Sequence, residues 1–185
     1  MKIEHSAIAD VLLLEPKVFS DARGFFFENY NKRAFRQATG LEVEFVQDNH
    51  SRSSKNVLRG LHYQLRQPQG KLVRVTVGEI WDVAVDLRRS SASFGRWTAA
   101  TLSAESHLML WVPAGFAHGF LVLSEQAEVQ YKTTDYYAPE HERTLLWNDP
   151  ALAIAWPLAG EPAMQPTMTD KDRRGTPLAA VETFE

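Results

Sequence analysis

The chain has 185 residues and no cysteine, so disulfides, thiolate metal ligands and cysteine nucleophiles are excluded. Its formal net charge of −3 lacks the strong basic field that broad nucleic-acid binding needs. The first residues do not resemble a signal peptide, and no apolar run approaches the ~18 residues of a membrane span. We therefore expect a single cytoplasmic domain over residues 1–185, with neither nucleic acid nor membrane as a partner.

Short apolar runs separated by single prolines and glycines predict an all-β domain. One short helix is expected from Lys32 to Thr39, with Gly40 as its left-handed stop. In chain order, strands are expected at Val11–Phe19, Gly24–Glu28, Val43–Asp48, Val57–Gln64, Leu72–Val77, Trp81–Leu87, Leu108–Val112, Phe120–Leu123 and Ala127–Thr134.

The strongest strand pattern runs from Leu72 to Leu87, where apolar and polar side chains alternate on both sides of Gly78-Glu79. This pattern predicts a hairpin with a two-residue loop. Roughly ten short strands with one dominant hairpin favour a sandwich or jelly roll. The interior of such a fold can hold a ligand between its two sheets.

Five segments place polar side chains within otherwise apolar strands. Their motifs are Arg-Gly-x-Phe-x-Glu, Gln-x-Asn-x-Ser, Val-Leu-Arg-Gly-Leu-His-x-Gln, Pro-x-Gly-Phe-Ala-His-Gly-Phe and a late Lys-Asp, within residues 21–28, 47–51, 57–64, 113–120 and 170–172. In this order, from about Phe19 to Asp172, the chain resembles the dTDP-4-dehydrorhamnose 3,5-epimerase family. The resemblance implies a cupin-type jelly roll with one or two short helices. It also implies a homodimer that acts on a dTDP-4-keto-6-deoxyhexose without cofactor or metal.

The chemistry of such a reaction needs three groups. A ketone at C4 acidifies the protons on C3 and C5, so inversion requires a base on one face, an acid on the other and a donor at the enolate oxygen. His62 is the candidate base, because imidazole is partly a free base near neutral pH. Lys71 shares its strand parity with Val73 and Val75 and is the candidate enolate stabiliser. Tyr131 is the candidate acid.

The family's Lys-Asp pair implies that Asp172 orients the His62 ring, with Asp170 as the competing residue. Each assignment has a plainer alternative. His62 and Tyr131 could be satisfied core residues of a sheet, and Lys71 could face solvent from its loop.

Further polar residues are candidates for substrate binding. Arginine's planar fork suits phosphate oxygens. The diphosphate and sugar hydroxyls are assigned to Arg23, Arg59, Gln47 and Asn49, and the thymine ring to Glu28. The resemblance adds His118, Glu142 and Lys171. An aromatic ring to stack on the base could come from Phe19, Tyr136 or Tyr137, and the sequence does not choose between them.

One spacing conflicts with a regular strand. Arg59 and His62 are an odd number of residues apart, which would place them on opposite faces. If both line one pocket, the strand must carry a bulge, and Gly60 is the expected place for it.

Three other functions stay open at this stage. A metal-dependent cupin typically has a His-x-His pair, but the corresponding stretch here is His62-Tyr63-Gln64. A non-catalytic sugar-nucleotide-binding domain would need the arginines but not the combination of His62, Lys71 and Tyr131. A single-centre epimerase or a ketoisomerase on a related sugar nucleotide would use the same residues, with Tyr131 aimed differently.

Overall fold

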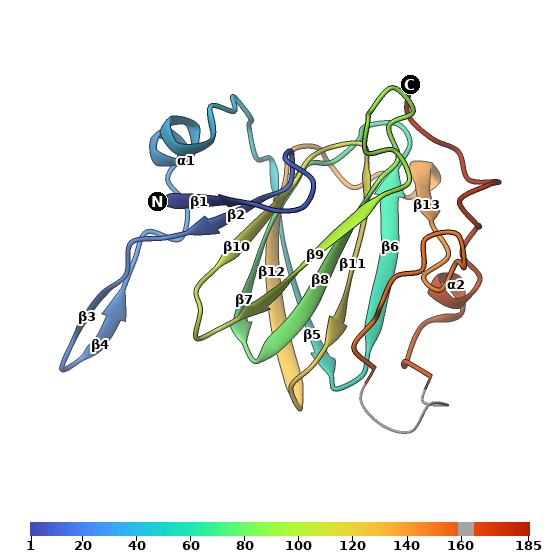
Figure 1. The fold of residues 1–185 in the computed structure, drawn as a ribbon. Helices are drawn as coiled ribbons and strands as arrows, with labels where there is room; N and C mark the ends of the chain where they lie inside the picture. The colour runs from blue at the N-terminus through green and yellow to red at the C-terminus, as the bar shows by residue number, and fades with distance from the viewer. Residues whose placement is uncertain (159–164) are drawn as a thin grey trace.

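In the computed structural model, which describes residues 1–158 and 165–185, most strands form two antiparallel sheets that pack face to face (Figure 1). The six-stranded sheet has the order β1 (Lys2–His5), β2 (Leu12–Glu15), β10 (Met109–Val112), β7 (Lys71–Val77), β12 (Gln126–Thr133) and β5 (Gln47–Ser54). The five-stranded sheet has the order β13 (Glu142–Thr144), β6 (Leu58–Gln64), β11 (Phe116–Val122), β8 (Glu79–Asp86) and β9 (Trp97–Ser103). This sandwich confirms the expected all-β, cupin-type jelly roll.

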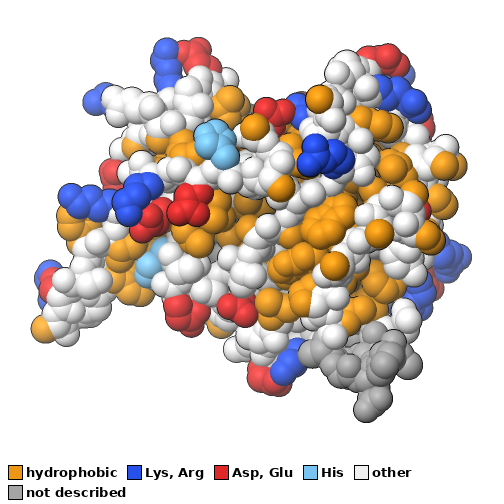
Figure 2. All heavy atoms as spheres, in the orientation of Figure 1, with side chains coloured by type: hydrophobic (Ala, Val, Ile, Leu, Met, Phe, Trp, Pro, Cys, Tyr) orange, Lys and Arg blue, Asp and Glu red, His pale blue; other side chains and the backbone are white. Residues whose placement is uncertain are grey.

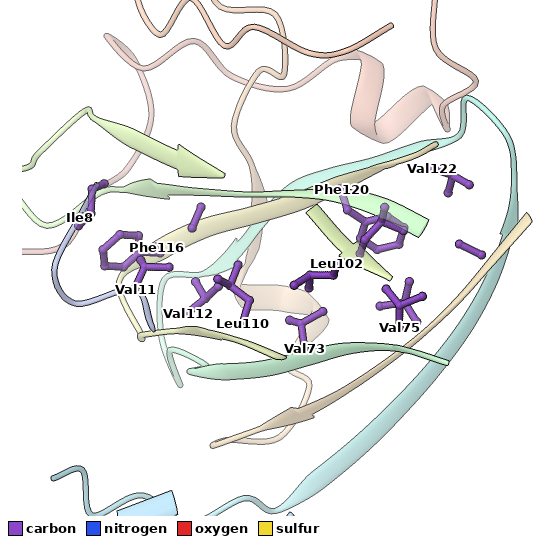
Figure 3. Close-up of a cluster of buried hydrophobic side chains, with 14 residues drawn as sticks. Ile8, Val11, Val73, Val75, Leu102, Leu110, Val112, Phe116, Phe120 and Val122 are labelled. Carbon is purple, nitrogen blue, oxygen red and sulfur yellow. The ribbon is translucent and has the colours of Figure 1, made fainter. Parts of the chain in front are cut away.

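The main hydrophobic core lies between the two sheets. Alternation along β7 points Val73 and Val75 inward, and Leu102 and Phe120 reach the same layer from the opposite sheet (Figure 3). All four side chains are at most 5% exposed. Complete burial of side chains of this size stabilises the fold by about 1.5–3 kcal/mol each. This layer holds the two sheets together, and its residue Phe120 also lines the cavity described below.

The outer faces of both sheets are also covered. The helix α1 (Lys32–Thr39) packs Phe35 edge-on against Trp111 of the six-stranded sheet. The chain after β13 covers the other sheet, with Leu145 and Leu152 packed against Val83 and Val85. Strand β8 is consequently buried on both faces, so its two faces cannot be told apart by polarity alone.

The predicted hairpin around Gly78 is wrong, although both of its strands exist. Strand β7 pairs with β10 and β12, whereas β8 pairs with β11 and β9. Gly78, at φ +73°, lets the chain pass from one sheet to the other. A Cβ atom at this position would lie 2.0 Å from the carbonyl oxygen of Gln126, so the crossing requires glycine.

The remaining expectations are mostly confirmed, with shifted boundaries. Helix α1 begins and ends as predicted, with Gly40 at φ +73°. The strand expected at Val43–Asp48 instead occupies Gln47–Ser54, and residues 41–46 form no strand. Strands β1, β9 and β13 and the short helix α2 (Asp170–Arg173) were not among the predicted elements. Within residues 1–158 and 165–185, no helix has the length and apolar character needed to cross a membrane.

A separate two-stranded hairpin extends away from the sandwich, as Figures 1 and 2 show. It consists of β3 (Phe19–Asp21) and β4 (Gly24–Phe26), and every residue in both strands is exposed. Its base is held by Phe25 and Phe27, whose rings lie 4.6 and 5.0 Å from that of His107.

Candidate active site

A cavity of about 600 Å³ opens between the two sheets, a volume within the range of small-molecule sites. Both sheets, helix α2 and the segment before α2 contribute to its wall. Most of the predicted site residues line it: His62, Lys71, Tyr131, Asp172, Gln47, Asn49, Arg59, His118, Glu142 and Lys171.

His62 lies on β6 and is held from behind by α2. Its Nε2 is 2.6 Å from Asp172 Oδ1, and the Asp172 side chain is 3% exposed whereas that of His62 is 26% exposed. The Thr169 hydroxyl caps α2 by accepting from the Asp172 N–H. Asp170, the competing residue, is exposed and pairs instead with Arg173 and Arg174.

The carboxylate of Asp172 is ionised under ordinary conditions. Burial raises its pKa, but the hydrogen bond and charge of His62, the Gly60 backbone N–H and the charge of Lys171 together lower the pKa below its usual range. An ionised carboxylate only accepts hydrogen bonds. Nε2 of His62 therefore donates to Asp172, which leaves Nδ1 as the nitrogen that can exchange a proton with a substrate.

The bulge expected at Gly60 is confirmed. On β6, Arg59 pairs with Phe120 and His62 with His118, so three steps on β6 match two steps on β11. Gly60 has φ +121°, and a Cβ atom there would lie 2.6 Å from the Gly119 Cα. The extra residue turns both Arg59 and His62 toward the cavity, which a regular strand cannot do.

Lys71 and Tyr131 approach from the opposite sheet. Tyr131 pairs with Val73 and Thr133 pairs with Lys71, so Lys71 and Tyr131 are diagonal neighbours on one face. Burial lowers the pKa of Lys71 to about 8, against the opposing charges of Asp82 and Glu142. Burial also raises the pKa of Tyr131, with Arg59 opposing the shift and Glu142 adding to it. Tyr131 therefore keeps its phenolic proton near neutral pH.

A polar group of residues lies along β5 and at the cavity mouth. Asn49 is directly opposite Tyr131 on the neighbouring strand, and its Oδ1 accepts from Gln47 Nε2 at 2.9 Å. At the mouth, Glu142 Oε2 accepts from Lys171 Nζ at 2.7 Å and from the Tyr137 hydroxyl at 3.2 Å. Of the three aromatic candidates, Tyr137 is the one that lines the cavity.

Two predicted binding residues do not reach the cavity of their own chain. Arg23 lies at the tip of the β3–β4 hairpin, where its side chain is 90% exposed and pairs with Asp21. Glu28 follows the same hairpin and accepts from Asn31 Nδ2. Their distance from the cavity in a single chain leaves their role in substrate binding a prediction.

Sequence reasoning missed other residues in the cavity wall and one directly behind it. Asp82 lies directly behind His118 and accepts from its Nε2 at 2.8 Å. Its alternation with Trp81 and Val83 was a visible signal, but the pattern does not reveal which face of β8 is inside. The remaining unpredicted lining residues are Ser51, Val57, Leu58, Tyr63, Gln64, Gln69, Gly119, Phe120, Thr167, Met168 and Thr169.

In the described parts of the chain, three or more His, Cys, Asp or Glu side chains do not gather at distances suited to one metal ion. The histidines of the cavity instead form separate pairs with Asp172 and Asp82.

Comparisons with known proteins place this geometry in a family. The family model described as dTDP-4-dehydrorhamnose 3,5-epimerase matches residues 5–180. This chain belongs to the dTDP-4-dehydrorhamnose 3,5-epimerase family. A family member from Pseudomonas aeruginosa is 61% identical over 184 residues, covering 100% of this chain and 99% of the relative. A family member from Shigella flexneri is 52% identical over 185 residues, with the same coverage.

Solved structures of related epimerases share the whole fold. A 3,5-epimerase from Legionella pneumophila in complex with dTDP-4-keto-L-rhamnose has a TM-score of 0.93 and 46% identity, covering 98% of this chain and 94% of that one. A 3'-monoepimerase from Streptomyces bikiniensis in complex with dTDP-quinovose has a TM-score of 0.86 and 34% identity, covering 95% and 88%. The family assignment agrees with the resemblance seen in the sequence motifs.

Proposed function

We propose that this epimerase inverts C3 and C5 of dTDP-4-dehydro-6-deoxy-D-glucose and forms dTDP-4-dehydro-L-rhamnose. The observation that supports the proposal best is the placement of His62 on one sheet and Tyr131 on the other, across a single cavity. A proton can then be removed from one face of the sugar ring and returned to the opposite face, which is the requirement for inversion.

His62 acts as the base in this proposal. Because Nε2 donates to Asp172, Nδ1 of the neutral ring is the nitrogen that removes the proton from C3 or from C5. The imidazolium that results is stabilised by the buried Asp172 carboxylate, which also fixes the ring orientation.

Lys71 and Tyr131 handle the charge and the returning proton. As the C–H bond breaks, electron density moves onto the C4 oxygen, and the Lys71 ammonium donates to that enolate oxygen. Such a donor in a site shielded from water stabilises the enolate more than water does. Tyr131 then gives its phenolic proton to the carbon from the face opposite His62. The phenolate recovers a proton from solvent and the His62 imidazolium releases one to solvent, so both groups are restored for the second carbon.

The nucleotide end is assigned to the polar wall and the mouth. The Arg59 guanidinium, fixed by Ser53 at 2.9 Å, is placed to contact the diphosphate. Gln47, Asn49 and His118 serve the sugar hydroxyls. The Glu142–Lys171 pair lies at the mouth with Tyr137, where the thymine ring can stack.

Arg23 and Glu28 support a homodimer in this proposal. Both lie on or beside a hairpin that extends beyond its own sandwich (Figure 1), and neither lines the cavity of its own chain. Phe19 and Phe26 are 53% and 68% exposed. Large apolar side chains gathered on an exposed hairpin are typical of a surface that contacts a partner. We infer that the hairpin enters the cavity of a second copy and completes its nucleotide site. The cytoplasmic location of the protein stays a prediction.

Mixing two inactive variants tests this arrangement. His62→Asn destroys the base but keeps the hairpin, whereas the double variant Arg23→Ala, Glu28→Ala keeps the base and damages the hairpin. Refolding the two together should produce hybrid dimers with one complete site and restore activity at low substrate concentration. If the mixture is no more active than its parts, residues of one chain do not complete the site of another.

A single-centre epimerase is the second candidate, because the 3'-monoepimerase shares the fold across 95% of this chain. The two candidates are separated by the product. The purified chain is incubated with dTDP-4-dehydro-6-deoxy-D-glucose, and the proton couplings at C3 and C5 are read by NMR. Inversion at both carbons supports the proposal, inversion at C3 alone supports the second candidate, and an unchanged sugar contradicts both.

A further inference from the structure

The Asp82 side chain lies on the inner face of β8, behind the cavity wall. It is 0% exposed, and its Oδ1 accepts from His118 Nε2 at 2.8 Å. Its other oxygen, Oδ2, is the one buried side-chain oxygen or nitrogen in residues 1–158 and 165–185 without a hydrogen-bond partner. A buried carboxylate oxygen left without a partner destabilises the fold, because it has lost its hydrogen bonds to water. Its position therefore calls for a compensating interaction.

The strand register places Asp82 in a row with the proposed base. His62 on β6 is directly opposite His118 on β11. On the other side of β11, Phe120 is opposite Asp82, so His118 and Asp82 are diagonal neighbours. The inner face of this sheet thus carries two histidine–aspartate pairs side by side. The first pair contains the proposed base. In the second pair, His118 is assigned to a sugar hydroxyl, whereas Asp82 has no role in the proposed function.

The candidate for a compensating charge is Lys71 on the facing sheet. Lys71 is half-buried in the cavity wall, and the charges of Asp82 and Glu142 oppose the effect of burial on the pKa of its ammonium group. A lysine removed from water readily loses its proton unless a nearby negative charge retains it. Glu142 already accepts from Lys171 and Tyr137, whereas Asp82 Oδ2 is uncommitted.

We propose that Asp82 is a positioning residue that acts through two neighbours: it keeps the Lys71 side chain in its ammonium form and holds the His118 ring in one tautomer. This inference rests on the proposed function, in which the Lys71 ammonium donates to the enolate oxygen. An ionised carboxylate only accepts, so His118 Nε2 carries the proton. Nδ1 of His118 then accepts a hydrogen bond from a substrate hydroxyl.

The other ionisable groups near Lys71 bear on the same equilibrium and must be counted with Asp82. They come from every strand around the cavity and from α2. They are His62 on β6, His118 on β11, Tyr131 on β12, Glu142 on β13, Arg59 on β6, and Lys171 and Asp172 on α2. Asp82 differs from the other two carboxylates. Glu142 already accepts from Lys171 and Tyr137, and Asp172 is paired with His62, whereas Asp82 Oδ2 has no hydrogen-bond partner.

Asp82→Asn tests the proposal, because the amide keeps the shape and an oxygen for His118 but removes the charge. We expect the alkaline limb of the kcat–pH profile to move down by about 1 pH unit, the lower end of the effect of a nearby charge. With a wild-type midpoint of about 8, kcat at pH ~7.5 then falls about threefold, while kcat at pH ~6 is retained. The matched control is Glu79→Gln at the start of the same strand, which does not line the cavity and should leave the profile unchanged.

Two results would overturn the proposal. An Asp82→Asn profile with the wild-type midpoint shows that Asp82 does not act on Lys71, and a loss of kcat that is equal at every pH shows a merely structural role. Both readouts require an active wild-type enzyme, so failure of the proposed function itself is seen first and separately.

If the variant does not fold, the wild-type protein carries the test. Nitrogen-15 NMR of the His118 ring should show a proton on Nε2. A proton on Nδ1 alone contradicts the proposal.

Discussion

Replacing Asp172 by asparagine isolates the contribution of the carboxylate behind the base. The Asp172 side chain is 3% exposed, and its Oδ1 lies 2.6 Å from His62 Nε2. A hydrogen bond of this charged kind contributes about 1.5–3 kcal/mol. If this energy stabilises the imidazolium in the transition state, kcat falls about 10- to 150-fold, since each 1.36 kcal/mol is tenfold in rate. Asparagine can also donate to Nε2 and favour the wrong tautomer, so losses toward the upper end are expected.

The assay is exchange of the C3 proton of the substrate with deuterated solvent, followed by NMR at several substrate concentrations. KM should change little, because Asp172 acts on the His62 ring. The control is Asp170→Asn on the same helix, since Asp170 is exposed and pairs with Arg173 and Arg174. The reasoning is refuted if Asp170→Asn loses as much activity as Asp172→Asn, or if Asp172→Asn raises KM at unchanged kcat.

Three further predictions follow from the site. For His62→Asn we expect near-complete loss of turnover with affinity for the substrate largely kept, measured by calorimetry; retained turnover would disprove the base. For Tyr131→Phe we expect preferential loss of inversion at one carbon, read from deuterium at C3 and C5; equal slowing at both would show that Tyr131 only packs. Because Lys71 must be protonated and its pKa is about 8, kcat should fall as pH rises through about 8, and a flat profile up to pH ~10 would contradict its role.

The sequence predicted those local features of the fold that a few neighbouring residues determine. Helix α1 was placed correctly because the stop at Gly40 is a local signal. The bulge at Gly60 was also predictable, since Arg59 and His62 could not otherwise share a face. Both predictions depend on backbone geometry within a few residues.

Features that depend on distant segments could not be predicted from the same patterns. The chain crosses between sheets at Gly78, yet its alternation of apolar and polar residues is the same as in a hairpin. Only the pairing partners distinguish a crossing from a hairpin: β7 pairs with β10 and β12, and β8 pairs with β11 and β9. The inward orientation of Asp82 was not predicted, because later segments bury the other face of β8 and both faces contain apolar residues.

The motif containing Arg23 and Glu28 presents a different limit. The sequence singled out these residues for substrate binding, but it does not say whether they act in the same chain. The exposed hairpin is the observation that points to a second copy, and no pattern within the motif carries that information.

Transfer of protons across the ring at two carbons is the central claim, and solvent labelling of the wild-type enzyme measures it directly. The enzyme is incubated in deuterated water with dTDP-4-dehydro-6-deoxy-D-glucose until equilibrium, and the product is examined by NMR. The account predicts deuterium at both C3 and C5 with both centres inverted. Inverted product without solvent deuterium, or label at neither carbon, would contradict it.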